Sequence, residues 1–93
     1  MNMKKSIRLY ITGSLQSMFF KEFIKTNALA NNIKGFLRTL EDGRIEIFLE
    51  GDGEKVSNMI SICSRGPKYA QIRNVEQKEE KFQDFKEFKI LNF

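Results

Sequence analysis

The sequence predicts an α+β fold of the ferredoxin-like type, a mostly antiparallel sheet with two helices on one face. Three observations predict it. Segments with a strand-like hydrophobic period alternate with two segments of helical period, in the order β-α-β-β-α-β with a short fifth strand after them. An Asp-Gly pair joins the two middle strands as a hairpin. The 93 residues suit one small core, so we expect a single domain over residues 1–93.

The first half of the chain contains two predicted strands with a helix between them. Residues 6–12 alternate apolar and more polar side chains, which is the period of a half-buried strand. A loop over residues 13–19 follows. Apolar side chains then recur at helical spacing over residues 20–32, and this helix should end before Gly35. Residues 35–40 are the second predicted strand.

The second half repeats this pattern after a tight turn. Asp42-Gly43 is a strong hairpin signal, and residues 44–50 after it alternate strictly, as in a strand with one buried face. Asp52 is a suitable N-cap for a second helix, which the pair Gly66-Pro67 should end. Four apolar side chains share one face of that helix: Val56, Met59, Ile60 and Cys63. The remaining predicted strands lie near residues 72–75 and at residues 87–92.

The composition excludes several kinds of site. The chain has no histidine and a single cysteine, Cys63, which argues against a zinc site and against a histidine general base. Cys63 lies on the apolar helix face, so we expect a small core residue and not a nucleophile. No apolar run approaches the ~20 residues that span a bilayer. We therefore expect no metal, no cofactor, no membrane association, a cytoplasmic location and a monomer.

Positive charge is concentrated in the first part of the chain. Residues 1–40 contain seven basic side chains and one acidic one, a net charge of +6, whereas residues 41–93 carry a net charge of −2. This asymmetry favours an anionic ligand near the first half, such as phosphate, an acyl phosphate or a nucleic acid.

The stretch from Gly13 to Lys21 is the part of the chain that best suits such a ligand. A strand that runs through a short loop into a helix N-terminus binds anions through backbone N–H groups and the helix dipole. Lys21, expected in the first helical turn, would add a mobile positive charge. The neighbouring rings of Phe19, Phe20 and Phe23 are expected in the core.

This stretch resembles the acylphosphatase pattern Gly-x-Val-Gln-Gly-Val-x-Phe-Arg. It reads Gly13-Ser14-Leu15-Gln16-Ser17-Met18-Phe19-Phe20-Lys21, and Gly35-Phe36-Leu37-Arg38-Thr39 is similar to the family's Gly-Trp/Phe-Val-x-Asn. Later family segments are matched in order by Asp42-Gly43-Arg44-Ile45-Glu46-Ile47, Glu50-Gly51-Asp52 and Gly66-Pro67. From near residue 7 to its end the chain is therefore identified as a member of the acylphosphatase family. The resemblance implies the same ferredoxin-like fold.

The resemblance also implies a site for binding phosphate and hydrolysing acyl phosphates to carboxylate and phosphate. The phosphate-binding positions are Leu15, Gln16, Ser17, Met18, Phe19, Phe20 and Lys21. Lys21 stands where the family has an Arg that binds phosphate, and Thr39 where it has an Asn that orients the attacking water. Ser17 replaces the second loop Gly, which matters if that position needs a positive φ. Because Lys lacks the planar fork of Arg and Thr lacks an amide, we expect phosphate binding with weak or absent hydrolysis.

Two alternatives share the same predicted fold. Tyr10 and Phe48 fall on the outward face of the sheet, where aromatic rings could stack on nucleic acid bases. Glu46 and Glu50 flank Phe48, and we expect both carboxylates in solvent, where they would repel phosphates. Lys34-Gly35-Phe36 matches only the opening of an RNA-binding signature and lies on the second strand instead of the third. A non-catalytic module that binds a protein through the same face is the other alternative.

Overall fold

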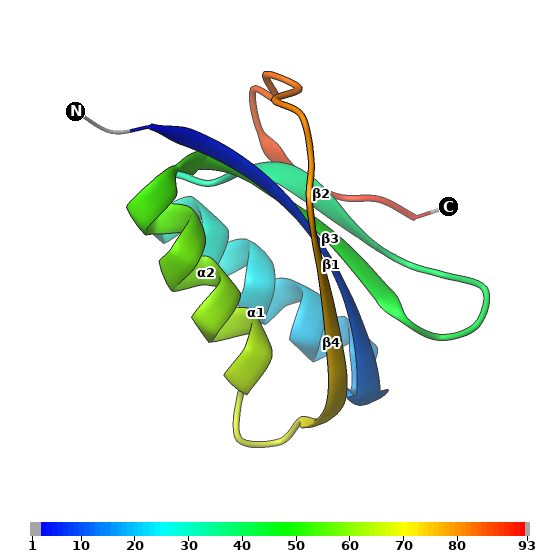
Figure 1. Cartoon of the computed structure of the whole chain (residues 1–93). Coiled ribbons are helices and arrows are strands. Elements are labelled where there is room, and N and C mark those ends of the chain that lie inside the picture. The colour runs from blue at the N-terminus through cyan, green and yellow to red at the C-terminus, as the bar shows by residue number, and fades with distance from the viewer. Residues whose placement is uncertain (1–2, 93) are drawn as a thin grey trace.

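The elements follow in the predicted order in the computed structural model, which describes residues 3–92. The strands are β1 (Lys4–Ser14), β2 (Lys34–Thr39), β3 (Ile45–Asp52), β4 (Gln71–Glu79) and β5 (Phe88–Ile90), and the helices are α1 (Ser17–Ala30) and α2 (Gly53–Arg65). They form one sheet in the order β4-β1-β3-β2-β5, with both helices on one face (Figure 1). This confirms the ferredoxin-like α+β fold. The first four strands are antiparallel, while β5 runs parallel to β2 and makes the sheet mixed.

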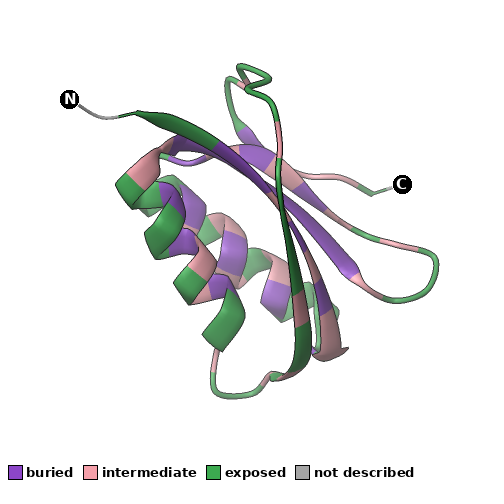
Figure 2. Ribbon diagram, viewed as in Figure 1, coloured by how far each residue is buried: buried purple, intermediate pink, exposed green. Residues whose placement is uncertain are grey.

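The core lies between the sheet and the two helices. In Figure 2 the buried surface of each helix is the one turned toward the strands. Phe20 and Ile24 on α1 are fully buried there, opposite alternate residues of β1 and β3. Each such side chain contributes about 1.5–3 kcal/mol of burial free energy. Cys63 on α2 is also fully buried, as predicted, and burial raises the pKa of its thiol to about 12. It is therefore a core residue with almost no thiolate at neutral pH.

Helix α1 begins three residues earlier than the sequence predicts. The carbonyl oxygen of Gln16 accepts hydrogen bonds from the amides of Phe19 and Phe20 at 3.0 and 3.1 Å, so the first turn starts at Ser17. Strand β1 also extends further than predicted and ends at Ser14. The predicted loop of seven residues is thus a two-residue connection, which shortens the path from strand to helix.

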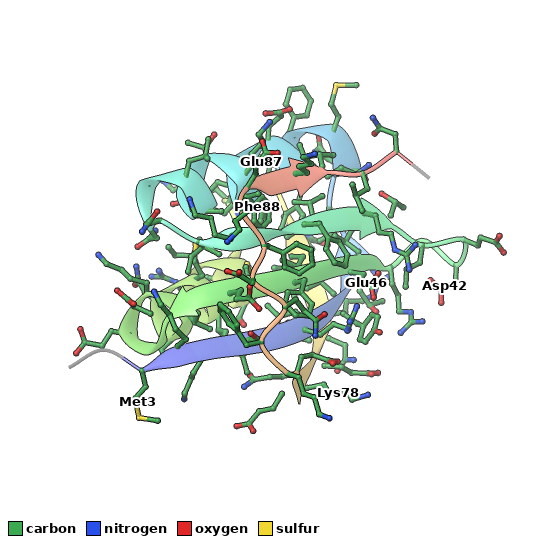
Figure 3. The ribbon with its side chains drawn as sticks, turned by 90° about the horizontal axis from the view of Figure 1, so that it is seen from above. Met3, Asp42, Glu46, Lys78, Glu87 and Phe88 are labelled. Carbon is green, nitrogen blue, oxygen red and sulfur yellow. The ribbon has the colours of Figure 1, made fainter. Side chains whose placement is uncertain are left out.

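The face of the sheet opposite the helices is covered by a segment that we call the strap (residues 80–87). Figure 3 shows the chain crossing over the strands between Lys78 and Glu87. Glu50 binds the strap: its carboxylate accepts hydrogen bonds from the amides of Gln83 (2.6 Å) and Phe85 (2.9 Å), and from the Ser6 hydroxyl (2.6 Å). Only 1% of the Glu50 surface is exposed. The expectation that Glu50 is solvated was therefore wrong.

Glu46 was also expected in solvent and is 3% exposed. Its carboxylate accepts hydrogen bonds from Arg8 (2.6 Å), Arg38 (2.5 Å) and the Tyr10 hydroxyl (3.3 Å). Burial alone would raise the pKa of the Glu46 carboxyl, but the hydrogen bonds and charges of Arg38 and Arg8 outweigh burial and lower that pKa. The Glu46 carboxylate thus stabilises the sheet face opposite the helices by joining Arg8, Arg38 and Tyr10.

The strap also covers the aromatic side chain on which base stacking would depend. The Phe48 ring lies 5.1 Å from the Phe85 ring and 5.8 Å from the Phe36 ring, centroid to centroid, and Phe48 is 1% exposed. A base therefore has no access to Phe48 while the strap is in place. Within residues 3–92 no helix is long and apolar enough to cross a membrane.

Candidate functional site

The site begins where β1 leaves the sheet. The pairing of β1 with β4 shifts by one residue between Thr12 and Gly13, and a Cβ atom on Gly13 would lie 2.1 Å from the carbonyl oxygen of Gln71. Only glycine permits this close approach of two backbones. Gly13 therefore sets the point at which the chain turns from the strand into the loop.

Gln16 holds the turn between strand and helix. It adopts the left-handed conformation (φ 52°, ψ 69°), which is uncommon for a residue with a side chain and costs about 1–3 kcal/mol. Ser17 does not have a positive φ. The replacement of the family's second loop glycine by Ser17 therefore imposes no strain at that position.

The start of α1 leaves a group of backbone donors open. Gln16 occupies the N-cap position without a side-chain cap hydrogen bond, and the first turn contains no acidic residue. Across the described part of the chain, no acceptor binds the amides of the segment 15–18. The amides of Phe19 and Phe20 are engaged by the Gln16 carbonyl, so the predicted set of donors narrows to Leu15, Gln16, Ser17 and Met18. We call these four amides the cradle.

Lys21 follows the cradle, in the second turn of α1 because the helix starts early. It is partly buried and borders two adjacent hollows, of about 300 and 550 Å³. Other cations of the first half are engaged elsewhere: Glu46 binds Arg8 and Arg38. In residues 3–92 neither Lys21 nor Lys25, one turn further along, forms an ion pair. These two lysines are therefore the positive charges that face the hollows beside the cradle.

Thr39 reaches the same place from the end of β2. Its hydroxyl oxygen lies 3.4 Å from that of Ser17, so the structure brings β2 and the first turn of α1 together. Thr39 and Lys21 border the smaller hollow with Leu91 and Asn92. Asn92 also borders the larger hollow. Sequence reasoning missed Asn92, because nothing in the motifs indicates that the chain after β5 returns to Thr39.

The aromatic residues of this region divide between core and surface. Phe20 is fully buried and Phe23 packs partly buried against the core, as predicted. Phe19 is 62% exposed, so its assignment to the core was wrong. Its ring meets the edge of Tyr69 at 6.2 Å between centroids. Because α1 starts at Ser17, Phe19 lies within the helix. The buried face of this helix consists of Phe20, Ile24 and Ala28, and Phe19 lies outside that face.

Comparison of the sequence with known protein families identifies the family to which the chain belongs. The model of the acylphosphatase family matches residues 7–90, nearly the whole chain. The chain belongs to the acylphosphatase family. This confirms the family predicted from the motifs around residues 13–21 and 35–39.

Individual acylphosphatases match over most of their length. The acylphosphatase of Syntrophus aciditrophicus is 32% identical over 90 residues, covering 96% of this chain and 94% of that protein. The acylphosphatase of Rubrobacter xylanophilus is 34% identical, covering 82% and 69%. Among solved structures, an acylphosphatase from Coxiella burnetii superimposes with a TM-score of 0.88 at 23% identity, covering 97% of this chain and 94% of that one. That structure supports the fold of this chain.

Within residues 3–92 the side chains offer no cluster suited to a metal ion. No group of three or more His, Cys, Asp or Glu residues in the described part of the chain could hold a metal ion. The polar groups around the cradle are backbone amides, two hydroxyls, two lysines, one carboxamide and the carboxylate of Glu22. This arrangement can bind an oxyanion and orient a water molecule beside it.

Proposed function

We propose that this protein binds acyl phosphates at the cradle and hydrolyses them slowly to carboxylate and phosphate. The observation that carries the proposal is the set of four open amides at the start of α1, with Thr39 held beside them by Ser17. A small anionic substrate of this kind fits a cytoplasmic enzyme.

The phosphoryl group would bind with its oxygens on the amides of residues 15–18. These donors are fixed by the strand–helix connection, so little free energy is lost in ordering them when the ligand binds. The dipole of α1 adds an attraction of about 0.3–1 kcal/mol for an anion at its N-terminus. Lys21 neutralises part of the phosphoryl charge from the side of the hollows.

Hydrolysis at this site is a displacement by water at phosphorus. The water oxygen forms a bond to phosphorus while the bond from phosphorus to the acyl oxygen breaks. The electron pair of the broken bond stays with the carboxylate, and both water protons end on the phosphate. The cradle assists because its donors face the oxygens on which negative charge is spread during the transfer.

Two side chains hold the reactants less firmly than the Arg and Asn of the family pattern. Lys21 holds a phosphoryl group as a single mobile charge, whereas the two-pronged guanidinium of an Arg fixes its orientation. Thr39 has one hydroxyl, which Ser17 shares, where an amide would offer both an acceptor and two donors. A missing positioned donor typically costs about 10²–10³ in rate, so we expect slow turnover.

The test is hydrolysis of benzoyl phosphate by the purified protein, with inorganic phosphate as a competitor. We expect measurable turnover that phosphate inhibits, and a fall in kcat/KM of about 10²-fold in Lys21→Ala. Lys55→Ala makes the same charge change at an exposed position on α2 and should retain the wild-type rate. The double variant Lys21→Arg/Thr39→Asn should be faster than wild type.

The proposal would be contradicted by turnover that inorganic phosphate does not inhibit and that stays at the wild-type rate in Lys21→Ala. Silence from both the wild type and the double variant, each shown to be folded by circular dichroism, would contradict it as well. A silent wild type beside an active double variant would leave the cradle as a phosphate-binding site whose hydrolysis has been lost.

A further inference from the structure

The chain that follows β5 lies beside Thr39. Strand β5 runs alongside β2 at the edge of the sheet (Figure 3), and Leu37 is paired with Ile90. The Leu91 amide donates a hydrogen bond of 2.8 Å to the Leu37 carbonyl oxygen, so the parallel alignment continues past the end of β5. Extending this register by two residues beyond Ile90 places Asn92 level with Thr39. Residues level with each other on neighbouring strands turn their side chains to the same face.

The hollow beside Lys21 supports this placement. Its lining consists of Lys21, Thr39, Leu91 and Asn92, so Asn92 and Thr39 border one space. Asn92 also borders the larger hollow together with Ser17, which belongs to the cradle. Asn92 is exposed, and within residues 3–92 its side chain makes no hydrogen bond. Its amide is therefore available to a ligand.

The chemistry of the smaller hollow shows what Asn92 adds. Lys21 can only donate hydrogen bonds, Leu91 offers no polar side-chain atom, and the Thr39 hydroxyl is shared with Ser17. A water molecule that attacks phosphorus needs an acceptor for one of its protons, because this turns an oxygen lone pair toward the phosphorus atom. The carboxamide of Asn92 is the side chain of this hollow that combines a carbonyl acceptor with N–H donors.

We propose that Asn92 is a further catalytic residue of this site, the amide that orients the attacking water beside the cradle. Its Oδ1 accepts a hydrogen bond from the water whose oxygen bonds to phosphorus, as the bond from phosphorus to the acyl oxygen breaks. The amide that the family places on β2 is thus supplied here from the chain after β5. This inference rests on the proposed hydrolysis of acyl phosphates, and the experiment separates the two.

The experiment compares Asn92→Ala with wild type on benzoyl phosphate. Because orientation of the water acts in the chemical step, kcat should fall about 10²-fold. The KM and the inhibition constant of inorganic phosphate should change less than about threefold, because the cradle is untouched. Asn74→Ala is the matched control, an exposed asparagine on the opposite edge strand β4, and should keep the wild-type kcat.

A second variant restores the amide from the other strand. Thr39→Asn placed in the Asn92→Ala background should recover most of the lost kcat, because the new carboxamide borders the same hollow. Thr39→Asn should raise kcat far less in the wild-type background, where Asn92 already provides the amide. A structural role of Asn92 would not produce this difference between the two backgrounds.

Three results would overturn the assignment. The first is a normal kcat in Asn92→Ala while wild type hydrolyses the substrate, which leaves the proposed function intact. The second is a loss in Asn92→Ala that raises KM equally and that Thr39→Asn does not rescue. The third is a wild type that binds inorganic phosphate but shows no turnover, because Asn92 then fails to orient water. Absence of both turnover and phosphate binding would overturn the proposed function itself.

Discussion

Two regions of this protein gather polar groups in opposite ways. On the face of the sheet opposite the helices, the carboxylates of Glu46 and Glu50 are buried and receive six hydrogen bonds from other residues of the chain. At the start of α1, four amides have no acceptor within residues 3–92. In the first region the protein supplies every partner, whereas in the second the amides have no acceptor among the described residues. The comparison teaches that the buried carboxylates serve the fold of this protein, whereas the unpaired backbone donors form the site that we propose for phosphate.

Removal of the Glu46 carboxylate should disrupt the region of buried carboxylates and cause the largest loss of unfolding free energy. Glu46→Ala leaves Arg8 and Arg38 without their shared acceptor, and loss of one partner of a buried pair costs about 3–5 kcal/mol. Because both guanidinium groups keep some exposure to water, we expect the lower end, about 3 kcal/mol of unfolding free energy. Urea unfolding measures it, with Glu76→Ala on the exposed side of β4 as the control. A loss below about 1 kcal/mol, the range of surface pairs, would contradict this account.

Lowering the pH should remove the stabilisation that the ionised Glu46 carboxylate provides at neutral pH. The pKa of Glu46 is lower in the folded protein than its ordinary value, so its contribution is present above the unfolded pKa of about 4.3. It is lost as the pH falls through the folded pKa. Wild type should therefore lose more unfolding free energy than Glu46→Gln between pH 6 and acid conditions. Parallel curves for the two proteins would show that Glu46 gains nothing from its arginines.

Relief of the backbone strain at Gln16, at the start of α1, should change the unfolding free energy by less and in the opposite direction. Gln16→Gly places a residue without Cβ at the left-handed position, which should stabilise the protein by roughly 0.5–1 kcal/mol. The backbone donors stay in place, so the inhibition constant of phosphate should stay near that of wild type. Thermal unfolding and competition with benzoyl phosphate measure the two quantities. Destabilisation would mean that the Gln16 side chain itself supports the turn.

The sequence predicted the parts of this structure that depend on local pattern. Alternation of Ile7, Leu9 and Ile11 identified β1, because residues of one face of a strand share one environment. Helical spacing identified the buried faces of α1 and α2 for the same reason. The order of these elements then left few ways to arrange one sheet with two helices.

The parts that escaped prediction depend on long-range packing. Alternation placed Glu46 and Glu50 on the outer face correctly, but it does not show what covers that face. The strap is rich in charged residues, a composition typical of exposed turns, and it is bound through its backbone. Gln16 is not a usual N-cap residue, so the start of α1 was placed too late. Asn92 escaped because the parallel pairing of β5 with β2 has no local signal.

The central claim is that the open amides bind the phosphoryl group, and a titration of the ¹⁵N-labelled protein with inorganic phosphate tests it most directly. We predict saturable shifts of the amide resonances of Leu15, Gln16, Ser17 and Met18. The amides of Gln83 and Phe85, which already donate to Glu50, should not move. Sodium chloride at matched ionic strength should shift neither set of amide resonances. Unchanged resonances over residues 15–18, with saturation elsewhere on the molecule, would contradict the account.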